Sequence, residues 1–117
     1  MTNSPKKHRK FEVTAIGQYL ACWPDVYEVP RGKDEVFDVV LPDHLGDYKI
    51  VGIDFKQNPR GAAKAQPAGE LKWTIEDNNK REVEQGQPYE KVKFSVLLQH
   101  RDCKHVMRSA DPIIVND

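Results

Sequence analysis

Three residues near the end of the sequence, Cys103, His105 and Met107, are of the types that bind copper. Their alternate spacing places them on one face of an extended strand, and thiolate, imidazole and thioether groups are suitable ligands. A straight strand spreads them over ~13 Å, however, whereas a copper loop wraps its ligands round one ion. A second histidine, His44 or His100, is also required. We therefore expect one face of a hairpin arm here, and keep a small copper- or zinc-binding or redox protein as the alternative function.

Other reactive side chains occur singly. His44 lies between Asp43 and Asp47, but this stretch lacks the spaced oxygen ligands of a calcium loop. Cys22 precedes Trp23, and it could act as a nucleophile only with a histidine close in space; a small buried thiol is the commoner role. The sequence has no GxSxG, GxGxxG, GxxxxGK, HExxH or CxxC motif. We therefore expect no enzymatic activity, no catalytic residue and no cofactor.

Length and composition indicate one globular domain. The 117 residues fit one domain, and a 38% hydrophobic content is enough to form a core. No apolar run approaches the ~18 residues of a membrane span, and the start lacks the pattern of a signal peptide. These features predict a cytoplasmic protein away from membranes. Cys22 and Cys103, the only cysteines, should then be free thiols.

The charge is balanced overall but not locally. Lysine and arginine together equal aspartate and glutamate at 18 each, which gives no general attraction to nucleic acid. The exception is the basic run from Lys6 to Lys10. We expect residues 1–10 to be a flexible basic arm and residues 11–117 to form the folded domain, with nucleic-acid binding unlikely.

Apolar residues alternate with polar ones in many short segments, and no segment keeps the spacing of an amphipathic helix. The pattern predicts an all-β fold, an immunoglobulin-like β-sandwich of seven to nine short antiparallel strands with turns every 8 to 12 residues or so. The expected strands are residues 11–15, 19–23, 26–29, 35–41, 48–55, 71–76, 81–85, 92–98 and 113–115.

Two segments invite more specific predictions. Gln57 to Gly69 is rich in alanine, proline and glycine without a regular apolar face, which is typical of a long exposed loop. Residues 71–76 should form a hairpin, with Asp77 to Lys80 as its turn. The return, Arg81 to Gln85, is so polar that it is expected at the edge of a sheet.

The clearest strand contains Val92, Phe94, Val96 and Leu98 on one face, and burying these four side chains is worth roughly 6 to 12 kcal/mol before entropy is subtracted. This strand should be central and should form a closing hairpin with the end of the chain. Within that hairpin, the Asp111-Pro112 pair favours an extended backbone. The Asp111 carboxylate is expected to accept hydrogen bonds from nearby backbone amides and so to clamp the start of the last strand.

The segment Phe94 to Leu98, together with the ending Ser109 to Asp117, resembles the small bacterial proteins of the DP-EP family. A DPxIxN ending is also similar to inclusion-body proteins of the AidA/PixA type. The resemblance implies a compact β-sandwich and no established set of catalytic residues.

The function expected from these features is binding or self-association by a non-enzymatic bacterial protein. Edge strands can pair with another chain, either a second copy or a protein partner. The expected contact surfaces are therefore the sheet edges and the segment Gln57 to Gly69.

Overall fold

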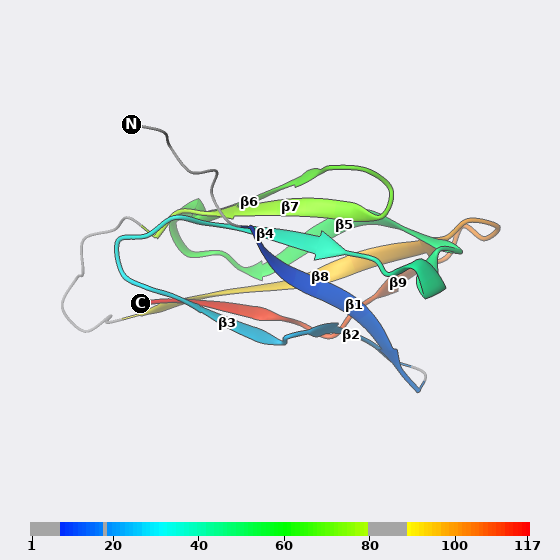
Figure 1. The fold of residues 1–117 in the computed structure, drawn as a ribbon, viewed down its shortest axis with the longest axis horizontal. Helices are drawn as coiled ribbons and strands as arrows, with labels where there is room; N and C mark the ends of the chain where they lie inside the picture. Colours follow the sequence, from blue (N-terminus) through cyan, green and yellow to red (C-terminus); the bar gives the residue numbers. More distant parts are fainter. Residues whose placement is uncertain (1–7, 18, 80–88) are drawn as a thin grey trace.

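The computed structural model describes residues 8–17, 19–79 and 89–117, and these form an all-β structure of two sheets (Figure 1). No helix in this part of the chain is long and apolar enough to span a membrane. The elements are β1 (His8–Ile16), β2 (Tyr19–Trp23), β3 (Val26–Val29), β4 (Glu35–Val40), the 3-10 helix η1 (Asp43–Leu45), β5 (Tyr48–Gln57), the 3-10 helix η2 (Pro59–Gly61), β6 (Ala63–Pro67), β7 (Lys72–Asp77), β8 (Glu90–His100), β9 (Val106–Arg108) and β10 (Ile113–Asn116).

The first sheet, sheet A, has the strand order β2-β1-β4-β7-β6, and sheet B has the order β3-β10-β8-β5 with β9 beside β8. Two pairs are parallel: β1 with β4, and β3 with β10. The prediction of purely antiparallel strands is therefore wrong. A parallel pair needs a connection that leaves the sheet and returns, and the chain does this when it crosses to β3 in sheet B before entering β4.

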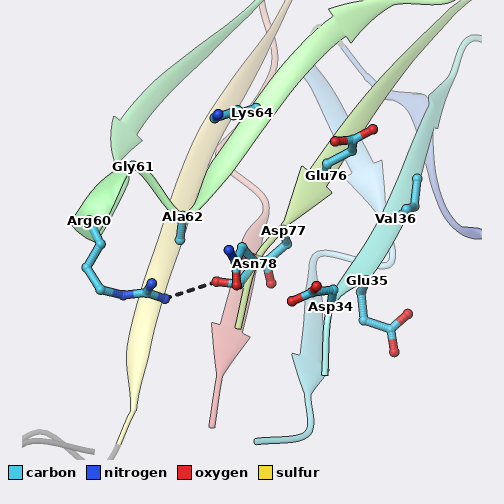
Figure 2. A pocket seen from close by; sticks show the side chains of 10 residues that line it. All are labelled: Asp34, Glu35, Val36, Arg60, Gly61, Ala62, Lys64, Glu76, Asp77 and Asn78. Carbon is cyan, nitrogen blue, oxygen red and sulfur yellow. Dashed lines mark hydrogen bonds between the residues drawn. The ribbon is translucent and has the colours of Figure 1, made fainter. Parts of the chain in front are cut away.

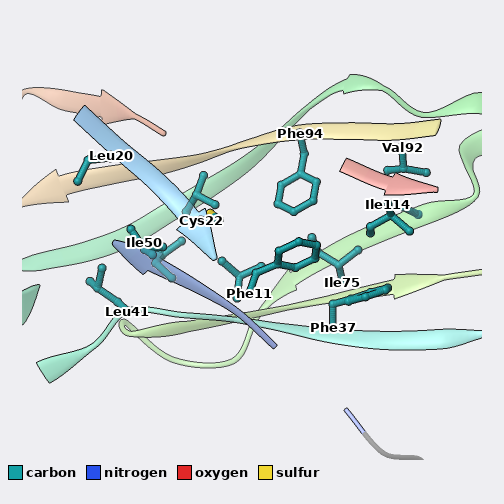
Figure 3. Packing of buried hydrophobic residues seen from close by; sticks show 14 of the residues in the cluster. Phe11, Leu20, Cys22, Phe37, Leu41, Ile50, Ile75, Val92, Phe94 and Ile114 are labelled. Carbon is teal, nitrogen blue, oxygen red and sulfur yellow. The ribbon is translucent and has the colours of Figure 1, made fainter. Parts of the chain in front are cut away.

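One hydrophobic core lies between the sheets. Phe11 and Phe37 from sheet A meet Phe94 from sheet B, and Figure 3 shows the three rings in the same interior. The ring centroids of Phe11 and Phe94 are 5.4 Å apart in an edge-to-face arrangement, which aromatic pairs favour. The predicted inward face of β8 is confirmed, because all four of its apolar side chains are at most 1% exposed.

Residues 57–69 are not one exposed loop, which corrects the sequence prediction. They contain η2 and the edge strand β6, and Ala62 and Ala63 are buried. The composition of β6 carries little strand propensity, so its conformation depends on pairing with β7 rather than on its own residues.

The expected hairpin of residues 71–85 also needs correction. Along β7 one edge pairs with β4 and the other with β6, so neither edge is open to the polar return. The predicted edge strand Arg81 to Gln85 lies outside the described residues.

The first strand begins inside the predicted arm. His8 pairs with Val36 of β4, and the His8 side chain lies 3.0 Å from a carboxylate oxygen of Asp38. Arg9 donates a hydrogen bond to the Glu28 carbonyl of β3. Residues 8–10 therefore belong to sheet A, whereas residues 1–7 of the predicted arm lie outside the described part.

The predicted closing hairpin is present, and its return has two parts. β9 pairs with residues 97–99 of β8, and β10 pairs with residues 90–93. Between them, Ser109 Oγ accepts a hydrogen bond from the Val96 N–H at 2.9 Å. Asp111 Oδ1 accepts one from Ser95 Oγ at 2.5 Å. The Asp111 carboxylate therefore accepts a hydrogen bond as expected, but the predicted donor is corrected, because it is a side-chain hydroxyl of β8 and not a nearby backbone amide.

Candidate functional site

A polar cleft of about 640 Å³ opens at the end of the fold where β4, β7 and η2 meet (Figure 2). Its walls carry more acids than bases. The charged residues that line it are Asp34, Glu35, Glu76 and Asp77, with Arg60 and Lys64. A cleft of this charge favours cationic or hydrogen-bond-donating groups.

Asp77 is the buried acid of this cleft. It follows Trp73 and Ile75 on the inward face of β7 and is only 1% exposed. The Asn116 side-chain amide donates a hydrogen bond to Asp77 Oδ1 at 2.9 Å, whereas Oδ2 has no hydrogen-bond partner among the described residues. Burial raises the pKa of Asp77 from 3.8 to about 6, because a carboxylate removed from water is less stable when charged.

Charged neighbours modify the pKa of Asp77 in both directions. Glu90 and Asp34 raise it further by repulsion, whereas the hydrogen bond from Asn116 and the positive charge of Arg60 lower it. Arg60 acts only through space, since its guanidinium donates to Glu90 and to the Asn78 carbonyl instead. Arg60, one of the two cations that line the cleft, is therefore paired with another acid.

The buried side chain of Asn79, two residues after Asp77, forms a second set of hydrogen bonds. Its Nδ2 donates to the carbonyls of Val29, Pro30 and Asp117, at 3.2, 3.0 and 3.1 Å. These contacts join the chain after β7 to the ends of β3 and β10. The sequence alone predicts Asp77 and Asn79 only as turn residues. The missed signal is the alternation of Trp73, Ile75 and Asp77, which places a carboxylate on a buried face.

A surface of exposed apolar side chains lies on the hairpin of β1 and β2. We call Ile16, Tyr19 and Trp23 the hairpin patch; they are 63%, 77% and 72% exposed. Tyr19 and Trp23 share the outer face of β2, and Ile16 is the cross-strand partner of Tyr19. A groove of about 460 Å³, lined in part by Ile16, Tyr19 and Met107, adjoins this patch.

The free edge of β6 is partly closed by a side chain. Asn58 donates from Nδ2 to the Ala63 carbonyl at 2.9 Å and accepts from the Ala63 N–H at 3.0 Å, as a neighbouring strand would. Pro67, at the other end of the strand, has no N–H to donate. Both features limit pairing with another chain.

Backbone groups at the edges of β2, β3 and β5 also have hydrogen-bond partners elsewhere in the chain. Ala110 donates to the Leu20 carbonyl of β2 at 2.7 Å, and the Arg9 side chain covers the Glu28 carbonyl of β3. On β5, the Ile50 carbonyl accepts from Trp73 Nε1 at 3.2 Å, and its N–H donates to Glu70. Backbone pairing at these edges must displace such contacts.

The proposed copper ligands do not lie along one strand. Cys103 and His105 lie in the exposed segment before β9, where the His105 N–H points to Cys103 Sγ at 3.4 Å. Met107 lies within β9 and packs against the core. The expectation of a continuous extended arm is wrong here, because β9 begins only at Val106.

The two candidate fourth ligands lie on different elements. His44 lies in η1 and is exposed, whereas the His100 ring at the end of β8 packs edge-on against Tyr48 at 5.1 Å. Within residues 8–17, 19–79 and 89–117, no group of three or more histidine, cysteine, aspartate or glutamate side chains is arranged to hold a metal ion.

Both cysteines are free, as expected from the sequence. Cys22 is buried, and burial raises the pKa of its thiol to about 11, whereas the side-chain hydrogen bond with Ser109, which stabilises the thiolate, opposes the rise. A thiol with that pKa is protonated at neutral pH, and the thiolate is the reactive form. Cys22 therefore behaves as a core residue, and Cys103 is the exposed thiol.

These features define a class: an all-β protein of two mixed sheets round one core, with a buried acid at one end and an exposed apolar patch on one hairpin. Comparison with known proteins adds no narrower assignment, since the sequence matches no family model and no curated protein. The resemblance to the DP-EP family stays a prediction.

Proposed function

We propose that this protein is a non-enzymatic bacterial β-sandwich of the immunoglobulin-like type that acts by binding or self-association in the cytoplasm. The observation that carries the proposal is the hairpin patch. It presents a tryptophan and a tyrosine, each more than 70% exposed, on one face of a two-stranded hairpin. Both residue types are enriched at the energetic centres of protein interfaces.

A partner that packs against exposed side chains fits this structure better than a partner that adds a strand to a sheet edge. The edges of β2, β3, β5 and β6 each have backbone groups engaged by other parts of the chain. A partner that pairs with an edge must first break those hydrogen bonds. A partner that covers Tyr19 and Trp23 removes apolar surface from water and breaks none of them.

The test is molar mass by light scattering during size exclusion, over a wide concentration range in reducing buffer. Self-association through the hairpin patch predicts a defined oligomer that the Tyr19→Ser, Trp23→Ser double variant loses. Tyr89→Ser is the matched control, since Tyr89 is 51% exposed and lies outside the hairpin. A wild-type protein that remains monomeric at every concentration contradicts self-association and leaves binding to a different partner as the proposed mode.

A further inference from the structure

The contact between Asp77 and Asn116 joins the two sheets at one end of the core. Asp77 is the last residue of β7 in sheet A, and Asn116 is the last residue of β10 in sheet B. Both side chains are buried, and one hydrogen bond of 2.9 Å links them. A polar contact between buried side chains of different sheets holds the sheets in one register only while both partners stay in place.

Two acceptor atoms beside this contact are buried without donors. Asp77 Oδ2 and Asn79 Oδ1 have no hydrogen-bond partner among the described residues. A buried acceptor without a donor is costly, more so when it carries charge. A proton on Asp77 Oδ2 removes the charge and turns one unpaired acceptor into a donor.

Several acids lie near Asp77, and repulsion from Asp34 and Glu90 favours its protonated form. Asp34 lies on the segment between β3 and β4, Glu35 is the cross-strand partner on β4, and Glu90 begins β8. Glu35 pairs with Arg9 at 3.6 Å, and Arg60 from η2 pairs with Glu90. Arg9 and Arg60 are thus paired with other acids. Lys64 of β6 also lines the cleft, but acids outnumber bases there.

We propose that the Asp77–Asn116 contact is a proton-controlled latch between the two sheets, closed when Asp77 is protonated and loosened when it is ionised. The adjoining cleft gives the ionised carboxylate a route to water. Turning towards the cleft breaks the bond to Asn116 and releases the end of β10. The proton comes from solvent and returns to it, so the latch responds to pH without a cofactor.

The direction of the pH response follows from the pKa of Asp77. Its value of about 6 in the closed state lies above the ordinary 3.8, so the closed state binds the proton more tightly than an opened or unfolded one. The latch is therefore strongest below pH ~4, weakens as the pH rises to ~6, and stays weak above that. The difference between 3.8 and about 6 sets a ceiling of about a hundredfold on the change in the opening equilibrium.

Hydrogen exchange at the end of β10 tests the latch. The Asp117 N–H donates to the Val29 carbonyl at 3.0 Å and reports local opening. Between pH 4.5 and 7.5 its protection factor, corrected for intrinsic exchange, should fall by roughly tenfold or more in the wild type. In Asp77→Asn the protection should stay high at both pH values, because the amide is neutral and still accepts the bond from Asn116.

The matched control is Asp54→Asn, an exposed carboxylate paired with Arg108 that has its pKa lowered rather than raised. It should keep the wild-type pH response. Equal protection in the wild type at the two pH values overturns the proposal, as does an unchanged response in Asp77→Asn. If that variant does not fold, a carbon NMR titration of the Asp77 carboxyl in the wild type decides instead. A midpoint near 6 that also moves the Asn116 amide signals supports the latch, and a midpoint near 4 refutes it.

Discussion

Ser109 lies in the gap between β9 and β10, and replacing it with alanine is a sharp test of how β8 is held. Its hydroxyl accepts the Val96 N–H at 2.9 Å and donates to the Ala110 carbonyl at 2.8 Å. The Ser109 hydroxyl thus takes the place of the backbone carbonyl that a continuous partner strand would offer to the Val96 N–H in the middle of β8. Ser109→Ala removes one oxygen atom and leaves both backbone groups without that partner.

The cost of this change follows from burial. Ser109 is 3% exposed, and Val96 is fully buried, so water does not readily replace the lost hydroxyl. An unsatisfied buried N–H costs roughly 1 to 3 kcal/mol, partly offset because the serine hydroxyl no longer has to be buried. We expect Ser109→Ala to lower the free energy of unfolding by about 2 kcal/mol. For a side chain of this size, such a loss is well above that of an ordinary surface change.

Urea denaturation gives the free energy of unfolding, and hydrogen exchange locates the change. The Val96 amide should lose protection more than the other amides of β8. Thr14→Ala is the comparison, because Thr14 is partly exposed and its side chain makes no hydrogen bond with other described residues; it should cost less than about 1 kcal/mol. If the serine variant loses no more stability than the threonine variant, the hydroxyl does not complete the hydrogen bonding of β8, and the reasoning is refuted.

Three further results are expected. Asn58→Ala frees the Ala63 backbone at the edge of β6, so it should increase aggregation measured by light scattering at high concentration; unchanged scattering would show that the edge is protected in another way. In thiol labelling at pH 8, Cys103 should react quickly and Cys22 only on unfolding, because burial raises the pKa of Cys22 to about 11; fast reaction of two thiols in the folded protein would contradict this. Elemental analysis tests the metal-binding alternative: stoichiometric copper or zinc that Cys103→Ala and His105→Ala both remove would support it, and a protein that takes up no added metal would eliminate it.

Alternation along single strands predicted local structure well where one face is buried and the other is wet. The start of β8 is the clear case, since buried Val92 and Phe94 alternate there with lysines, whereas Ser95, farther along on the opposite face, is buried as well. β6 shows the opposite. Its alanine, glutamine and proline residues carry no such contrast, and only the neighbouring strand β7 makes the segment extended. Alternation in a sequence indicates which face of a strand is buried. It does not indicate which neighbouring strand pairs with that strand and stabilises it.

The site was harder to predict for the same reason. Asp77 and Asn116 come from distant parts of the chain, and their contact depends on the order of strands in both sheets. The copper hypothesis depended on Cys103 and His105 continuing the strand of Met107, and the strand begins one residue after His105. Parallel pairing was missed because alternation is the same in parallel and antiparallel strands.

The parallel pairing of β3 with β10 has a consequence for synthesis on the ribosome. Val26 to Val29 pair with Ile113 to Asn116, and β10 also fills the space between β3 and β8. Most of the chain must therefore leave the ribosome before sheet B can close. Until then β3 and one edge of β8 lack their partner strand and remain open to solvent. The nascent protein is thus exposed to wrong partners from the time β3 emerges until β10 has emerged, and slower elongation between these two strands would lengthen that interval.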